Sequence, residues 1–320
     1  MKVLVVVLNY RTPDLAVRCL ESLEAEVAEV GSMHVVVTDN DSGDDSVAII
    51  GEAIERHSWR WCELMPLSKN GGYCFGNNAG IRPHLFKEGA PEFVMLLNPD
   101  TYIRPGAVSR LVSYLERHED VGIAGARLEG PDGAIQNGAF RFPTPTREML
   151  DGFRLGILSK AMRTGDIFYD LGDQPMAVDW VVGAAMMIRR EVFDDIGLLD
   201  EGYFLYFDEV DFCLRARRAG WSAHYVPQSV VVHLVGRSTG ISDPNKRPPR
   251  FPTYWFDSRR RFFLKHHGAV KTLAADLGFL GGYTTWRVRR VIQRKPDGDP
   301  PWFWLDFLRN STLLKGFDLE

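Results

Sequence analysis

Cysteine is scarce in this chain. The four cysteines among its 320 residues form no CxxC pair and lie far apart, at Cys19, Cys62, Cys74 and Cys213. This spacing argues against a disulfide framework and against a zinc site built from thiolates, and it is typical of a reducing compartment. We therefore expect a cytoplasmic protein.

Long apolar runs are also missing. The opening residues, MKVLVVVLNY, contain an apolar run that stops at Asn9 without a small-residue cleavage site, which disfavours a signal peptide. No later stretch reaches the length of a transmembrane helix. With 45% hydrophobic and 25% charged residues, the composition is that of an ordinary globular chain, either one large domain or a domain with an appendage.

Net charge is small but unevenly distributed. The whole chain carries −4, yet residues 235–295 contain 14 lysines and arginines against three acids, about +11, which leaves about −15 elsewhere. This asymmetry points to an anionic surface or partner for the C-terminal segment.

Within that segment the sequence TYWFDSRRRFFLKHHG predicts a basic aromatic helix over 253–268, preceded by a loop rich in Pro, Ser and Gly over 237–252. Two interpretations are open. The helix either lies on an anionic membrane surface or packs on the rest of the protein with its arginines solvated. Nucleic acid is a weaker candidate, and we expect no such partner. The residues concerned are Trp255, Phe256, Arg259, Arg260, Arg261, Phe262, Phe263 and Lys265.

Strand-like runs alternate with helical patterns over the first 120 residues. Four apolar runs, KVLVVVLNY, MHVVVTDN, WCELMPL and EFVMLLNPD, are each followed by a helical pattern. In the first such pattern, Thr12 is placed to cap and Pro13 occupies the first helical position. Because parallel strands need helical crossovers, these four units predict a doubly wound, mostly parallel α/β sheet.

The regular alternation of strand-like and helical patterns ends after residue 122. The runs VGIAGARLEGPDG and VDWVVGAAMMIRR predict two further strands. The irregular stretch between them, 143–175, predicts a loop with one helix over about 147–162.

Polar residues follow the apolar runs. In an open parallel sheet, ligands bind beyond the carboxyl ends of the strands, so these positions predict a binding site. The runs end at Asn9 and Tyr10, at Asp39, Asn40 and Asp41, at the loop 68–80, and at Asn98, Pro99 and Asp100.

The type of ligand follows partly from what this edge lacks. No GxGxxG follows the first strand, and the glycines of GGYCFGNN precede Asn77 and Asn78 where a P-loop has Lys and Ser or Thr. The Asn- and Gly-rich loop 70–78 allows a close backbone approach. Asp39 can accept hydrogen bonds from a base or ribose, and Asp100 offers hard oxygen ligands that suit Mg²⁺ or Mn²⁺ on a diphosphate.

Three acids open another helical pattern, in YFLYFDEVDFCLRARRAGW. Asp208 is a good helix cap, and Asp211 is spaced to pair with Arg215 at i,i+4. These structural roles leave Glu209 without one. Cys213, on the same pattern, is interpreted as buried packing rather than a nucleophile.

Six segments together resemble family 2 glycosyltransferases with the GT-A fold, and the subgroup they resemble most is rhamnosyltransferase-like. The resemblance covers roughly residues 1–267 and is carried by VVVLNYRTPDLAVRCLESL, VVVTDNDSGDDS, NGGYCFGNNAGI, LLNPDTYIRPGAVSRLV, VGAAMMIRREVFDDIGLLDEGYFLYFDEVDFCLRARRAGW and VVHLVGRST. It implies a catalytic domain over 1–235, with a nucleotide-sugar half (1–120) and an acceptor half (121–235). A basic, aromatic extension follows over 236–320.

The resemblance also implies a set of donor-binding residues. Asn9 and Tyr10 would line the base pocket, and Asp39 would contact uracil, thymine or the ribose. The residues that would approach the nucleotide are Asn70, Gly71 and Asn77.

A metal site is implied as well. NPD takes the place of the DXD motif, so Asn98 replaces the first acid and Asp100 becomes the main ligand for Mg²⁺ or Mn²⁺. His233 matches a histidine that completes the metal site in some relatives, although a strand-end histidine is as often structural. The small residues Gly183, Ala184 and Ala185 would pass under donor and acceptor. The alternative explanation for their small side chains is tight packing of the strand.

The implied reaction is direct displacement with inversion. Rhamnose or a hexose would move from a dTDP- or UDP-sugar to a hydroxyl of a glycan or a lipid-linked acceptor, which would place the protein at the inner face of the membrane. The second member of an acidic pair serves as base in this family, and Asp208–Glu209 takes that place. Its order is Asp-Glu rather than the more usual Glu-Asp, which makes Asp208 the alternative base. Glu209 is the expected base, because Asp208 at the helix cap is occupied by backbone amides and Asp211 by Arg215.

Two other functions are alternatives. A nucleotidyltransferase should show a Gly-rich, basic loop directly after the first strand, and LNYRTPDL lacks it. A non-catalytic nucleotide-sugar-binding or scaffold protein stays open because the NPD motif is reduced.

Overall fold

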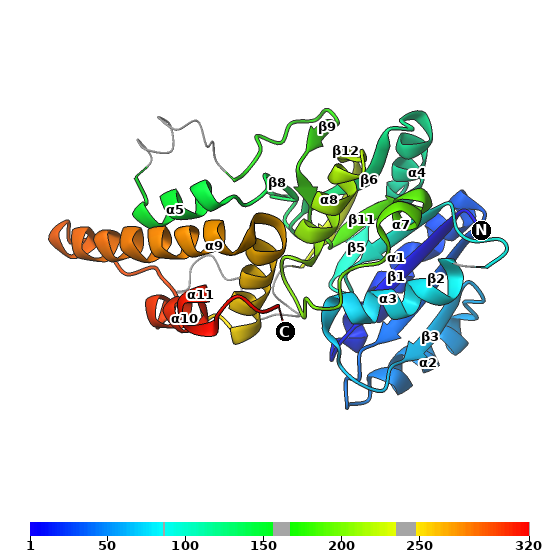
Figure 1. Ribbon diagram of the computed structural model, residues 1–320. Helices are drawn as coiled ribbons and strands as arrows, with labels where there is room; N and C mark the ends of the chain where they lie inside the picture. Colours follow the sequence, from blue (N-terminus) through cyan, green and yellow to red (C-terminus); the bar gives the residue numbers. More distant parts are fainter. Residues whose placement is uncertain (86, 156–166, 235–247, 320) are drawn as a thin grey trace. The chain divides into compact units, whose positions relative to one another are not determined.

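The computed structural model describes residues 1–85, 87–155, 167–234 and 248–319, and the chain divides into two compact units (Figure 1). Unit 1 comprises Met1–Phe140, Phe168–Glu201 and Asp208–Gly240. Unit 2 comprises Arg141–Ile167, Gly202–Phe207 and Ile241–Glu320. Two inner segments therefore group with the C-terminal helices, whereas the sequence suggested a single boundary near residue 235.

Unit 1 is built on a ten-stranded sheet. Its first four strands in spatial order are parallel, as the alternating pattern predicted: β3 (Cys62–Pro66), β2 (Met33–Asp39), β1 (Val3–Asn9) and β4 (Phe93–Leu97). The order continues with β11 (Ala185–Arg189), β6 (Val121–Glu129), β12 (Ser222–His233) and β5 (Thr101–Ile103). Because β11 is antiparallel to both β4 and β6, the sheet is mixed but mostly parallel, and the predicted fold class is confirmed.

Helices cover both faces of the parallel part. Successive side chains of a strand point to opposite faces, so Val3, Val5 and Val7 of β1 share one face and join one buried core with residues of three helices. These helices are α1 (Pro13–Val30), α2 (Ser46–His57) and α4 (Ala107–Arg117). On the opposite face lies α3 (Gly72–Leu85), and the close approach depends on glycine: a Cβ at Gly76 would lie 2.3 Å from Leu8.

The run VDWVVGAAMMIRR does not form the single strand predicted for it. The chain changes partner twice. β9 (Met176–Val178) pairs with β12, and β10 (Trp180–Val181) pairs with β8 (Ala139–Phe140) in a separate two-stranded sheet before β11 joins the main sheet. Gly183 therefore lies in the connection between β10 and β11. The remaining elements of unit 1 are β7 (Ile135–Gln136), α7 (Arg190–Ile196) and α8 (Asp208–Arg218).

Unit 2 is helical. It contains α5 (Pro145–Phe153), α9 (Thr253–Ile292), α10 (Phe303–Asn310) and α11 (Thr312–Lys315). The predicted helix over 147–162 corresponds to α5, which ends earlier because Arg154 adopts a left-handed conformation, and residues 156–166 lie outside the described part. The predicted helix over 253–268 is the first half of α9, which is broken at Gly268 (φ 78°).

The basic aromatic helix packs with its phenylalanines buried, as the packing interpretation predicts, but two of its arginines are buried rather than solvated. Arg259 is only 2% exposed, and its guanidinium pairs with Glu148 at 2.6 Å and with Asp276 at 2.8 Å. Arg260 is also buried and donates to the carbonyl of Asp318. Because Phe256, Phe262 and Phe263 are buried too, most of this cluster belongs to the core of unit 2. None of the helices among the described residues is long and apolar enough to cross a membrane.

Candidate active site

The ends of β1 and β2 are joined by a buried hydrogen-bond cluster. Asn9 Nδ2 donates to Asp39 Oδ2 at 2.7 Å, as the parallel register places these residues side by side. Ser42 donates to the same carboxylate from its hydroxyl, at 2.7 Å, and from its backbone N–H, at 3.1 Å. Asp39 is therefore fixed in one orientation at the predicted edge of the sheet.

The residues after Asn9 form an exposed rim to this cluster. Tyr10 is 39% exposed, and the Arg11 guanidinium lies 5.1 Å from its ring centre while donating to the carbonyl of Ser42. Thr12 makes no side-chain cap on α1, contrary to prediction, because its hydroxyl donates to Asn9 Oδ1 at 3.1 Å. Tyr10 thus offers an exposed aromatic ring directly after Asn9, the partner of Asp39, and such a ring suits stacking of a base.

The loop before α3 is attached to the end of β2. Asn40 Nδ2 donates to Asn70 Oδ1 at 2.9 Å and to the carbonyl of Gly72 at 3.1 Å, while its Oδ1 accepts from the backbone N–H of Gly71. The structure therefore brings Asn70 and Gly71 to the same edge as Asp39. Asn77 is placed differently: it is buried in α3, and its amide donates to the carbonyl of Tyr73.

Asp100 and His233 meet through strand pairing. β5 and β12 are antiparallel, and His233 stands opposite Thr101, so the residue before β5 lies beside the end of β12. His233 Nε2 is 3.5 Å from Asp100 Oδ1, and Asp100 is 1% exposed. The structure thus brings together the two residues that the sequence suggested as metal ligands, with Asn98 half-buried two residues before Asp100.

Tyr73 joins the glycine-rich loop to the small-residue stretch. Its hydroxyl donates to the carbonyl of Gly183 at 2.9 Å, and a Cβ at Gly183 would lie only 2.6 Å from that hydroxyl. Burial, followed by the charges of Asp208 and Glu209, raises the pKa of Tyr73 well above its usual range. The acids at the start of α8 are therefore close enough to Tyr73 to interact with it electrostatically.

The three acids of α8 have different surroundings. Asp208 is buried and its Oδ1 accepts from the backbone N–H of Glu209 at 2.7 Å. Asp211 is fully buried and pairs with Arg215 at 2.8 Å, as predicted. Arg215 also donates to two backbone carbonyls before α8, so this pair holds the helix in place. Glu209 is half-buried.

Cys213 is 1% exposed, and burial raises the pKa of its thiol to about 12. A thiol of this kind stays protonated at neutral pH and is a poor nucleophile. The interpretation of Cys213 as a packing residue is supported.

Three residues of the site region were missed from the sequence. Ser42 follows Asp39 by only three residues and bonds its carboxylate through both its backbone N–H and its hydroxyl, so a local side-chain contact could have identified it. Tyr73 and Asn78 act over long sequence separations: Asn78 Nδ2 donates to the carbonyl of Leu199, and its Oδ1 accepts from the N–H of the same residue. No local pattern predicts such contacts.

The sequence comparison identifies the class of protein. The chain matches the model of the family described as "Glycosyltransferase like family 2" over residues 2–248, and it belongs to that family. It is a glycosyltransferase with the GT-A fold.

Curated relatives include several rhamnosyltransferases. The chain is 28% identical over 243 residues to the N-acetylglucosaminyl-diphospho-decaprenol L-rhamnosyltransferase of Mycobacterium tuberculosis, covering 74% of this chain and 77% of that one. It is 25% identical over 235 residues to the rhamnosyltransferase WbbL of Escherichia coli K12, covering 72% and 83%. With the dTDP-rhamnosyl transferase RfbF of Shigella flexneri, identity is 24% over 260 residues, covering 79% and 78%.

Solved structures agree with the fold. The mannosyltransferase PcManGT of Pyrobaculum calidifontis, solved with GDP-Man and Mn²⁺, superposes with a TM-score of 0.55 at 16% identity, covering 91% of this chain and 75% of that one. GalNAc-T7, solved with UDP, GalNAc and Mn²⁺, gives a TM-score of 0.58 at 14% identity, covering 99% and 59%.

Proposed function

We propose that this glycosyltransferase transfers a sugar, rhamnose or a hexose, from a dTDP- or UDP-sugar to a hydroxyl of a lipid-linked glycan. Curated relatives from three bacteria bear names of rhamnosyltransferases, and one of these names specifies a diphospho-decaprenol acceptor. The donor, acceptor and inverting mechanism are our proposal for this chain.

The observation that carries the proposal is a continuous set of contacts along the carboxyl edge of the sheet. The Asn9–Asp39 cluster reaches the loop before α3 through Asn40, and the same loop continues into Tyr73. Tyr73 bonds Gly183, whose neighbour Ala184 accepts from the N–H of Asn98, two residues before Asp100. Groups suited to a base and a diphosphate are therefore connected by hydrogen bonds and short stretches of chain.

The residues present fit a divalent metal. Asp100 and His233 offer one carboxylate and one imidazole whose facing atoms are 3.5 Å apart, a separation that two ligands of one ion can have. When bound there, Mg²⁺ or Mn²⁺ would neutralise charge on the leaving diphosphate. Asn98, in place of a second acid, leaves the site with less negative charge than a two-acid DXD motif.

Glu209 is the proposed base. Among the acids of α8, Asp211 is paired with Arg215 and Asp208 accepts from a backbone N–H, whereas Glu209 is half-buried in the first turn. Glu209 would remove the proton of the acceptor hydroxyl as its oxygen bonds to the anomeric carbon. The bond from that carbon to the diphosphate oxygen breaks, and the nucleoside diphosphate leaves with the electron pair.

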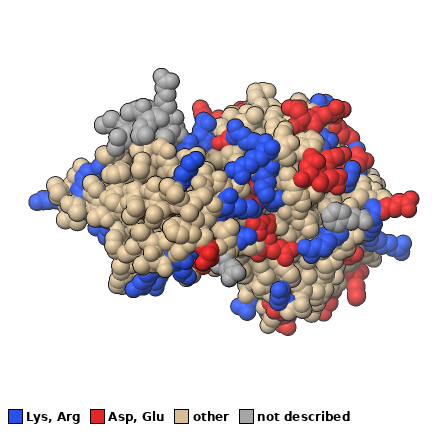
Figure 2. All heavy atoms as spheres, viewed as in Figure 1, with Lys and Arg blue, Asp and Glu red and all other residues tan. Residues whose placement is uncertain are grey.

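A lipid-linked acceptor would be reached at a membrane surface, and unit 2 offers a different face from the one predicted. The last turns of α9 expose Val288, Val291 and Ile292, the last by 76%, and Arg294 and Lys295 follow them, also exposed. On the face shown in Figure 2, the surface formed by α9 to α11 is mostly uncharged, with basic side chains along its margin. Apolar side chains beside cations are the combination that binds anionic lipid, so we assign the membrane contact to these turns.

Purified protein and a set of nucleotide sugars test the proposal. dTDP-rhamnose, UDP-hexoses and GDP-mannose are each incubated with Mg²⁺ or Mn²⁺ and a polyprenyl diphosphate carrying N-acetylglucosamine. Release of nucleoside diphosphate coupled to a larger lipid-linked product supports transfer, and the expected donors are pyrimidine nucleotides. Binding without release or transfer would favour the scaffold alternative.

A further inference from the structure

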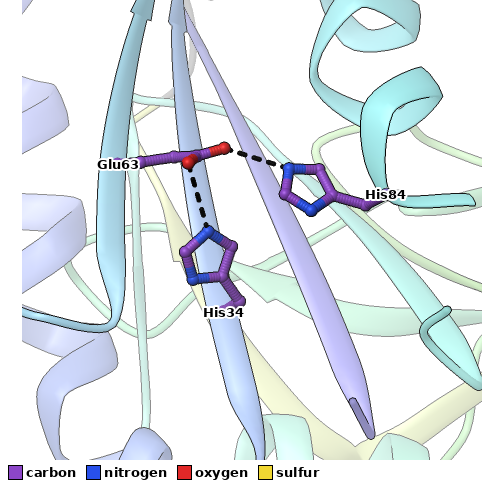
Figure 3. A group of neighbouring side chains, drawn as sticks. All are labelled: His34, Glu63 and His84. Atoms are coloured by element: carbon purple, nitrogen blue, oxygen red, sulfur yellow. Dashed lines mark hydrogen bonds and ion pairs between the residues drawn. The ribbon is translucent and has the colours of Figure 1, made fainter. Parts of the chain in front are cut away.

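A second group of metal-binding side chains lies away from the candidate active site. In the part of the chain that the structure describes, His34, Glu63 and His84 form a group whose ligand atoms all lie within 4.8 Å of one another (Figure 3). Figure 3 shows the Glu63 carboxylate between the two imidazoles, with one oxygen directed at each ring. Glu63 Oε1 is 3.0 Å from His84 Nε2, and Oε2 is 3.7 Å from His34 Nε2.

Strand register explains why the three side chains meet. Val36 of β2 stands opposite Glu63 of β3, and His34 precedes Val36 by two residues, so His34 and Glu63 share one face of the sheet. This is the face on which α3 packs, and His84 is in the last turn of α3. The site therefore joins three elements.

The group is separate from the donor-binding edge. β2 ends at Asp39, five residues beyond His34, which corresponds to roughly 17 Å along an extended strand. His34 and Glu63 lie at the amino ends of their strands, and the proposed donor-binding and metal residues lie at the carboxyl edge. Nothing in the reaction proposed above uses them.

We propose that His34, Glu63 and His84 bind a transition-metal ion such as Zn²⁺. Two imidazole nitrogens and one carboxylate are a known zinc ligand set, with water as the fourth ligand, whereas Mg²⁺ prefers oxygen throughout. Four-coordinate zinc needs ligand atoms about 3.3 Å apart, so modest side-chain rotations close the site. Such rotations are available because the Glu63 side chain is 43% exposed and that of His34 is 25% exposed.

A lysine beside His84 allows a further prediction about this site. Lys87 Nζ lies 3.3 Å from His84 Nδ1. A ring that binds metal through Nε2 carries its proton on Nδ1, so both the metal charge and this proton repel the ammonium. Lys87 is exposed and can turn into solvent, and Lys87→Met should therefore strengthen metal binding.

Cobalt titration of tag-free protein tests the proposal. Co²⁺ gives visible absorption in a four-coordinate site, and the His233→Ala background removes a ligand of the proposed catalytic metal. We expect one equivalent of Co²⁺ to bind, Zn²⁺ to displace it, and Zn²⁺ to raise Tm. His34→Gln and Glu63→Gln should each weaken binding more than about tenfold, and Lys87→Met should strengthen it.

Two controls keep the outcome clear. His57→Gln removes an exposed histidine outside the group and should leave Co²⁺ binding unchanged. His84 is buried, so its variant is used only if circular dichroism in EDTA shows that it folds. The proposal is wrong if the His233→Ala parent protein binds no Co²⁺, or if adding His34→Gln or Glu63→Gln leaves its Co²⁺ affinity unchanged. The group would then be only a set of hydrogen-bonded side chains.

Discussion

His233 Nε2 lies 3.5 Å from Asp100 Oδ1, although 133 residues separate them, because β12 and β5 pair with His233 opposite Thr101. A short strand that the sequence did not predict therefore assembles the candidate metal site. The same pairing makes the site dependent on the register of β12, since a shift by one residue would turn the imidazole to the other face.

Asp100→Ala should remove most of the metal dependence of donor binding and turnover. Wild type should bind a dTDP- or UDP-sugar better with Mn²⁺ than without, measured by calorimetry, and the variant should show little difference. Turnover should fall by about a hundredfold or more, because several kcal/mol of charge stabilisation are lost. Glu119→Gln, an exposed acid on the loop before β6, serves as control. Unchanged Mn²⁺ dependence in Asp100→Ala would remove the metal role of this residue.

Gly183→Ala should destabilise the contact with Tyr73. The added Cβ would lie 2.6 Å from the Tyr73 hydroxyl but 3.2 Å from the ring carbon that carries it. We expect a loss of about 1 to 3 kcal/mol in unfolding free energy, and a smaller further loss when Tyr73→Phe is added, because the closest atom is then absent. A double-mutant cycle by urea denaturation measures this coupling, and strict additivity would contradict the contact.

Asp211→Asn should lower stability much more than an equivalent change on the surface. Asp211 is fully buried against Arg215, so the variant leaves the guanidinium without its charge partner, at a cost of about 3 kcal/mol. The matched control is Asp194→Asn, which breaks an exposed i,i+4 pair with Arg190 and should cost less than about 1 kcal/mol. Equal urea midpoints for the two variants would show that the buried pair contributes no more to stability than the exposed pair.

Membrane association through the end of α9 should depend on exposed apolar side chains there. The Val291→Glu, Ile292→Glu double variant should float less with anionic liposomes at low salt than wild type, because it adds negative charge and removes apolar surface. Val270→Glu changes a still more exposed valine earlier in α9 and is the control. Wild-type protein that never floats would exclude this surface as a membrane contact.

The parallel half of the sheet could be predicted because its information is local. Each of the first four strands is a continuous apolar run with a helical pattern after it, and Asn9 and Asp39 follow from that pattern alone. The family resemblance added His233 and Glu209, which no local pattern distinguishes from a strand-end histidine or a first-turn acid.

The rest could not be predicted because it depends on partners distant in sequence. VDWVVGAAMMIRR has the composition of one strand, and only its neighbours in space divide it among three. The sequence predicts a surface cation at Arg259 because its two acids, Glu148 and Asp276, are 111 residues before it and 17 residues after it. A charged residue is identified as buried only when such partners are known.

Replacement of Glu209 by Gln tests the central claim most directly, since it keeps the shape of the side chain and removes the proton acceptor. With enzyme in excess over the nucleotide sugar and with saturating acceptor, single-turnover transfer should fall by roughly a hundredfold or more while donor affinity changes little. Asp208→Asn, measured in parallel, should affect mainly stability, since Asp208 is buried and accepts from the backbone of α8. Near-normal transfer by Glu209→Gln together with a collapse in a folded Asp208→Asn protein would contradict the account and assign the base to Asp208.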